Sequence, residues 1–130
     1  MSVHHVAKVS IPVSDPDRAK VFYCDKLGFE VRSESSVDEK SREQRWVELV
    51  PPGAQTSLTL VTWFASMPPG SLQGLVLEAA NLDAAVEQLR SKSVKTGNVE
   101  NAPWGRYVTL KDPDGNGLVL QQSGEQAKAS

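Results

Sequence analysis

The stretch KVSIPVSDPDRAKVFYCDKLGFEV, residues 8–31, decides the fold because it contains the signals of a strand and of a helix in direct succession. Apolar and polar residues alternate over residues 9–13, which is typical of a half-buried strand. Ser14 or Asp15 can cap a following helix, and apolar residues recur at helical spacing until Gly28 ends it. The stretch therefore predicts a strand that packs one face and leaves the other free for chemistry, followed by a helix.

The rest of the first half reads as three short strands, FEVRSE, RWVELV and SLTLV. They are separated by SVDEKSREQ (36–44), which is too polar to be buried, and by the turn-forming PPGAQ. After the linker-like SMPPGSLQ the same order begins again with the strand GLVLEA. Asn81 caps a second helix with Leu82, Val86 and Leu89 on one face, and VKTGNVE, RYVTLK and LVLQQ supply the last strands.

This order predicts an α+β fold in which two βαβββ modules form a curled mixed sheet with a cleft and carry their helices on the outer face. We expect a single domain over residues 1–130. Module one covers about 5–64, a linker about 65–73, module two about 74–122, and a disordered tail about 123–130.

The charge balance argues against several classes of partner. The chain has 14 basic and 16 acidic residues, without the basic patch expected of a nucleic-acid or anionic-membrane binder. We find no signal peptide, and no run approaches the ~18 apolar residues of a transmembrane helix. The single cysteine, Cys24, rules out an internal disulfide and fits a reducing compartment. We expect a cytoplasmic protein whose partner is a small molecule or another protein, with no nucleic acid and no membrane.

The segments IPVSDPDRAKVFYCDKLGFEV, NLDAAVEQLRSKSV and WGRYVTLKDPDGNGLVLQ, in this order, resemble the vicinal oxygen chelate superfamily. That superfamily contains glyoxalase I, extradiol dioxygenases, fosfomycin-resistance enzymes and bleomycin-resistance proteins, and the resemblance covers about residues 5–122. It implies paired modules whose strands curl into a cleft, commonly completed by both chains of a dimer. We therefore expect a homodimer.

The same resemblance places up to four metal ligands on strands, and here those positions hold Lys8, Thr59, Gly74 and Val119. Such side chains are poor ligands for a divalent metal. His5 lies three residues before Lys8 and points to the opposite face of a regular strand, so we interpret His4 and His5 as surface residues. The resemblance therefore points to a metal-free, bleomycin-resistance-like branch with no cofactor and no metal site.

Strand alternation sends a mixture of aromatic and polar side chains into the cleft. Trp104 stands in a loop beside a glycine, where binding residues are often displayed. Trp46 and Trp63 fit the cleft, the core or a dimer interface equally well. The candidate ligand-binding residues are Lys8, Ser10, Trp46, Glu48, Thr59, Trp63, Glu78, Trp104, Arg106, Tyr107, Thr109 and Gln121.

Two interpretations of the charged candidates remain open. Lys8 and Glu48 either form a structural ion pair, or Lys8 holds a ligand oxygen where the family would hold a metal. Arg106 either binds or stacks on an anionic ligand or plays an ordinary surface role. Glu78 is the best candidate for a general base if any reaction occurs, but no residue is assigned a catalytic role.

The function hypothesis is a metal-free protein that sequesters a bulky hydrophobic or aromatic compound, such as an antibiotic, and confers drug resistance by binding. The alternative is a metal-independent lyase or isomerase of the glyoxalase-like superfamily that uses Lys8, Glu48 or Glu78 for proton transfer. A third interpretation is a dimeric interaction module that has lost both metal and ligand. We favour sequestration, in which case the protein is not an enzyme.

Overall fold

The computed structural model describes residues 2–38 and 41–124, with side chains described outside 36–45. The first half contains β1 (Lys8–Pro12), α1 (Pro16–Val21), η1 (Phe22–Lys26), β2 (Glu30–Asp38), β3 (Ser41–Val50) and β4 (Ser57–Val61). The second half contains β5 (Gln73–Glu78), α2 (Leu82–Ser91), β6 (Glu100–Ala102), β7 (Gly105–Lys111) and β8 (Gly117–Ser123).

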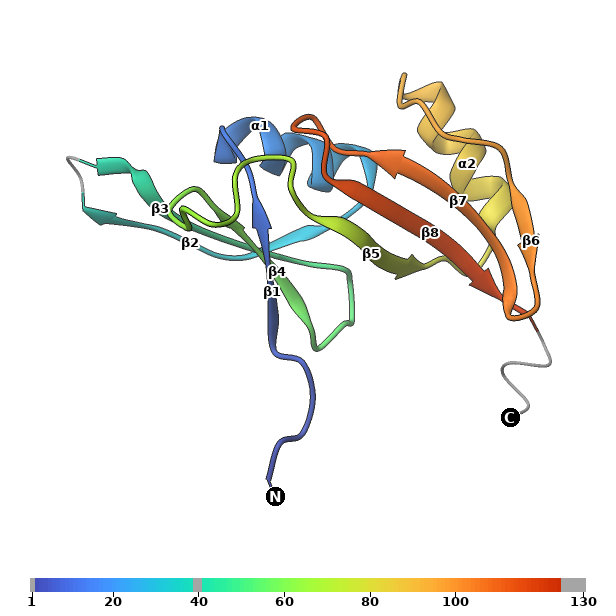
Figure 1. Ribbon diagram of the computed structural model, residues 1–130, viewed down its shortest axis with the longest axis horizontal. Coiled ribbons are helices and arrows are strands. Elements are labelled where there is room, and N and C mark those ends of the chain that lie inside the picture. The colour runs from blue at the N-terminus through green and yellow to red at the C-terminus, as the bar shows by residue number, and fades with distance from the viewer. Residues whose placement is uncertain (1, 39–40, 125–130) are drawn as a thin grey trace.

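The strands form two four-stranded mixed sheets with the same internal order, β1-β4-β3-β2 and β5-β8-β7-β6 (Figure 1). In each sheet the first and last strands of the module pair in parallel, and the other pairs are antiparallel. The α+β fold and the repeated module order predicted from the sequence are therefore confirmed.

Both helix starts follow the predicted capping. The Asp15 side chain accepts hydrogen bonds from the N–H groups of Asp17 and Arg18, and Asn81 accepts one from the N–H of Ala84. The single helix predicted before Gly28 is instead α1 followed by the π-helical turn η1. Within the described part of the chain, every helix is too short or too polar to span a bilayer.

Strand boundaries differ from the prediction in three places. The polar segment 36–44 does not separate two short strands, because β2 and β3 pair through much of it. The segment VKTGNVE contributes only Glu100 to β6 and a single bridge from Thr96 to Leu110. Strand β8 continues through Ser123, and residues 125–130 of the predicted tail lie outside the described residues.

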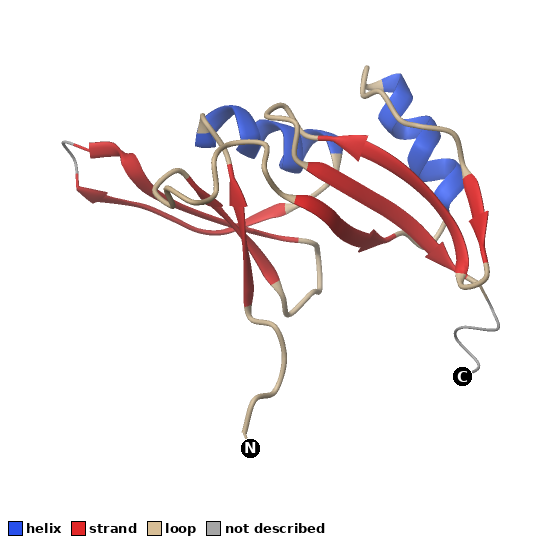
Figure 2. Ribbon diagram, in the orientation of Figure 1, coloured by secondary structure: helices blue, strands red, loops and turns tan. Residues whose placement is uncertain are grey.

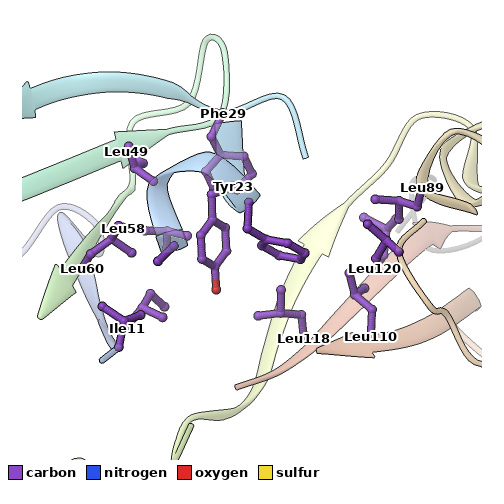
Figure 3. Packing of buried hydrophobic residues seen from close by; sticks show 14 of the residues in the cluster. Ile11, Tyr23, Phe29, Leu49, Leu58, Leu60, Leu89, Leu110, Leu118 and Leu120 are labelled. Carbon is purple, nitrogen blue, oxygen red and sulfur yellow. The ribbon is translucent and has the colours of Figure 1, made fainter. Parts of the chain in front are cut away.

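Apolar residues from both modules form one core on the helix side of the sheets (Figure 3). Figure 2 shows the helical segments on one side of the strands. Alternate strand residues supply the core from both sheets, and its fully buried members include Ile11, Tyr23, Leu49, Leu60, Leu82 and Leu118. The opposite side of each sheet has no helix of the described chain packed on it, and we call it the open face.

A buried polar cluster joins the modules inside this core. The hydroxyl of Tyr23 donates to Oδ2 of Asp112 at 2.9 Å, and Nδ2 of Asn116 donates to the same oxygen at 2.8 Å. Asn116 is fully buried and also donates to the carbonyl of Pro12 at 2.8 Å. Burial, reinforced by the charge of Asp112, raises the pKa of Tyr23 far above its usual range. The cluster therefore ties module one to the β7–β8 hairpin of module two.

We expect Tyr23→Phe to lower the free energy of unfolding by about 1–3 kcal/mol, because the buried Asp112 carboxylate loses a hydrogen-bond donor. Urea denaturation followed by circular dichroism measures the loss. Tyr107→Phe is the matched control and should change stability by no more than about 0.5 kcal/mol, since Tyr107 is only half-buried. Equal effects of the two substitutions would contradict the role given to the cluster.

Candidate functional site

The open face of module one is organised around a buried carboxylate. Glu48 on β3 is 5% exposed and accepts a hydrogen bond from the hydroxyl of Ser57 at 2.6 Å. The Nζ of Lys8 lies 3.9 Å and the Nε of Arg32 lies 3.7 Å from Oε2 of Glu48. Lys8 and Glu48 thus lie within ion-pair distance, as the first of the two interpretations of this pair requires. Because three side chains hold the carboxylate of Glu48, the charges of this patch are fixed in position before a ligand binds. We call Lys8, Arg32, Glu48 and Ser57 the polar patch.

Thr59 lies at the centre of the same face. It pairs with Ser10 across the parallel ladder and with Glu48 across the antiparallel one. Its side chain is 2% exposed, and Oγ1 has no hydrogen-bond partner among the described residues. A buried hydroxyl left unpaired costs free energy, so a polar atom brought close to Oγ1 would be stabilising. Trp46 is half-buried two residues before Glu48 on β3.

The open face of module two carries an aromatic pair. The rings of Trp104 and Tyr107 are stacked, with centroids 5.3 Å apart and planes inclined by 30°. Trp104 occupies the tight turn between β6 and β7 and is 42% exposed. A side chain at the neighbouring Gly105 would collide with the backbone of Gln122, so the close approach of the turn to β8 requires glycine there. Thr109 is exposed further along the same face of β7.

Beside this pair, the carboxylate of Glu78 is held by neighbours on β8. It accepts hydrogen bonds from Nε2 of Gln121 at 3.0 Å and from the hydroxyl and N–H of Ser123 at 2.7 and 2.9 Å. Both carboxylate oxygens are thus engaged. Glu78 and Gln121 form a polar border next to the aromatic pair, and their parallel strands β5 and β8 fix the spacing.

One of the candidate residues, Arg106, lies on the helix side. The guanidinium of Arg106 binds the carboxylate of Asp83 on α2 at 2.8 and 3.1 Å, so Arg106 points to the helix side of β7. The hydrogen bond from Arg106 lowers the pKa of Asp83 below its usual value. Trp63 follows the end of β4 and packs at a tilted angle on Phe64, with centroids 6.0 Å apart. We therefore leave Arg106 out of the open faces.

Three residues that contact the site were missed in the sequence. Ser57 and Ser123 share strand parity with Thr59 and Gln121, so the alternation rule would have found both. Arg32 lies beside a shift in register between Val31 and Ser33. Strand alternation does not predict the face of a residue at such a bulge.

The four family ligand positions do not fit a divalent metal. Lys8 pairs with Glu48, Gly74 has no side chain, and Val119 is apolar. Thr59 offers a single hydroxyl. Across residues 2–38 and 41–124, histidine, cysteine, aspartate and glutamate do not gather in a group of three or more able to hold a metal. We assign these positions no role in metal binding.

Comparison with known proteins gives a consistent family. The model of the Glyoxalase/Bleomycin resistance protein/Dioxygenase superfamily matches residues 2–120. TnmS3, an antibiotic binding protein from Streptomyces sp. CB03234, is 41% identical with a TM-score of 0.89, covering 95% of this chain and 99% of that one. A glyoxalase/bleomycin resistance protein from the same strain is 42% identical with a TM-score of 0.81, covering 91% and 100%. YaeR of Escherichia coli K12 is 31% identical over 128 residues, covering 92% and 95%.

We expect Ser57→Ala to lower the free energy of unfolding by about 1.5–3 kcal/mol, because Glu48 is a buried charge that loses a short hydrogen bond. Ser123→Ala is the control: it removes the equivalent bond to the exposed Glu78 and should cost less than about 1 kcal/mol. Thermal and urea unfolding of both variants measure the difference. A larger loss for Ser123→Ala would show that Glu48 is not the preorganised centre of its face.

Proposed function

The chain belongs to the Glyoxalase/Bleomycin resistance protein/Dioxygenase superfamily, and from this premise we propose that it binds a bulky hydrophobic or aromatic small molecule. The compound, such as an antibiotic, is held without a metal ion and released unchanged, so that the protein protects by sequestration. The observation that carries the proposal is the stacked pair of the exposed Trp104 and the half-buried Tyr107 on the open face of module two.

The aromatic pair suits a flat ligand for energetic reasons. Trp104 offers a large ring surface at a low cost in conformational entropy, and Tyr107 limits the orientations that the indole can adopt. Each well-formed aromatic contact adds ~0.5–1.5 kcal/mol beyond the burial of apolar area. Val76 on β5 is 48% exposed and extends the apolar surface. Glu78 and Gln121 supply polar contacts at its border.

The likeness to TnmS3 supports the same class of ligand, since that protein is described as an antibiotic binding protein. Further support comes from the family ligand positions, whose side chains offer no set of donors suited to a divalent metal. Lys8 and Ser10 would instead recognise polar groups of the compound by hydrogen bonding. The buried Glu48 and Thr59 lie beneath them, and Glu48 holds Lys8 in place. The single free cysteine, Cys24, fits binding in the cytoplasm.

A homodimer would complete the binding site. In one chain the two open faces are each uncovered, and a cleft that buries most of a bulky ligand needs a second wall. A second copy can supply that wall by placing the open face of its own module against that of this chain. The polar patch around Glu48 and the aromatic pair would then contact opposite parts of one ligand.

The test of the proposed function is a titration with bulky aromatic natural-product antibiotics, followed by tryptophan fluorescence. We expect saturable quenching, and we expect Trp104→Ala to weaken binding by about tenfold or more, equivalent to ~1.4 kcal/mol of lost contact. Arg106→Gln is the matched control and should bind as the wild type does, because Arg106 lies on the other side of β7. Undiminished binding by Trp104→Ala would remove the main support for the proposal.

Each compound is then recovered from the complex and its mass is measured. Sequestration predicts an unchanged mass. An altered mass would establish an enzyme instead, and Glu48→Gln and Glu78→Gln would show which carboxylate transfers the proton.

Sedimentation equilibrium tests the assembly. We expect the mass of a dimer, and we expect the compound to strengthen association because both chains contact it. A monomer at all concentrations, with the compound still bound tightly, would contradict the shared site.

A further inference from the structure

Besides the open faces, the molecule has a cavity that neither ring of the aromatic pair lines. Its volume is about 720 Å³, and it opens where the segment after α2 runs along the edge of β7. The N–H of Gly97 donates to the carbonyl of Thr109 at 2.9 Å and holds that segment in place. The start of β5, the β7–β8 hairpin and the end of η1 contribute the remaining walls. Drug-sized ligands occupy pockets of ~300–1,000 Å³, so the space is adequate for one small molecule.

The lining combines an apolar interior with a positively charged border. Phe22, Val94, Leu110 and Leu118 line the cavity and are at least 91% removed from solvent. Four lysines also line it, and they come from η1, from the segment after α2 and from the end of β7: Lys26, Lys92, Lys95 and Lys111. Apolar walls beside several cationic groups favour a ligand that has both an apolar body and a negative charge.

No carboxylate of the described residues forms an ion pair with these lysines. The Nζ of Lys26 donates to the carbonyl of Lys92 at 2.9 Å, and the Nζ of Lys92 donates to the carbonyl of Asp25 at 2.7 Å. These two bonds fix the ammonium groups near one another without neutralising their charge. Asp112 also lines the cavity, but its carboxylate is held by Tyr23 and Asn116. The excess positive charge is therefore available to a ligand.

We propose that this cavity binds an amphipathic organic anion, with the apolar body against Leu110 and Leu118 and the anionic group beside Lys26 and Lys92. Lys111 shares the face of Thr109 by strand alternation, and the bridge from Thr96 to Leu110 places Lys95 opposite it, so these two lysines lie on the other side of β7.

No tryptophan lines the cavity, so the anion does not depend on the ring of Trp104. Gly74, Thr109 and Val119 do line it, so the cavity reaches the strands that carry the open face of module two. Substitution of the lysines and substitution of Trp104 therefore test the two proposals separately.

The probe is 8-anilinonaphthalene-1-sulfonate, whose fluorescence rises in apolar surroundings. We expect saturable binding of one molecule per chain, weakened at about 0.5 M salt because screening reduces the attraction of the partly exposed lysines. The double substitution Lys26→Gln and Lys92→Gln should weaken binding by about fivefold for each charge removed. Lys92 is exposed and Lys26 is half-buried, and circular dichroism verifies that the fold persists.

Three controls make the result decisive. Trp104→Ala should leave the affinity for the probe unchanged, whereas it should lower the affinity for the aromatic compound of the proposed function. Lys20→Gln removes a lysine outside the cavity, one that pairs with Glu34, and should also leave binding unchanged. N-phenyl-1-naphthylamine, which lacks only the sulfonate, should bind at least about tenfold more weakly. The proposal is overturned by absent binding, by equal binding of the neutral analogue, or by a loss on Trp104→Ala instead of on the lysine substitutions.

Discussion

The carboxylate of Asp112 is the group on which the arrangement of the two modules depends. It is 5% exposed and accepts hydrogen bonds from Tyr23, from the side chain of Asn116, and from the N–H groups of Asp114 and Asn116. A buried carboxylate is costly unless such donors surround it. The β7–β8 hairpin, which carries Asp112 and Asn116, and η1, which carries Tyr23, must therefore approach each other closely. Since the hairpin joins β7 to β8, this approach also fixes the sheet that carries the aromatic pair.

Strand alternation then divides the molecule into a packed side and an open side. On β7, Val108 and Leu110 are buried toward α2, while Tyr107 and Thr109 lie on the other face. On β7, every second residue therefore packs into the core, and the residues between them can contact a ligand without disturbing the packing. The same division places Arg106 against Asp83 and keeps it away from Trp104.

Much of this was predictable from local sequence, and the failures have physical causes. The caps at Asp15 and Asn81 and the packed faces follow from rules that act within a few residues. The extension of β2 and β3 and the bulge near Arg32 depend on the pairing of the two strands, which the sequence of neither strand specifies alone. The sequence left two roles open for Arg106 because its partner, Asp83, lies on α2 and is distant in the sequence. The lysine cavity brings together η1, the segment after α2 and β7, which no short motif reveals.

In the proposed function, an open face of the protein binds an aromatic compound intact and without a metal. The direct test is a crystal structure of the protein with the tightest-binding antibiotic, prepared in the presence of a metal chelator. We expect an unaltered compound stacked on the indole of Trp104, on the face of β7 opposite α2, with polar groups of the site as its hydrogen-bond partners. A chemically altered compound, a compound bound only on the helix side, or binding abolished by the chelator would contradict it.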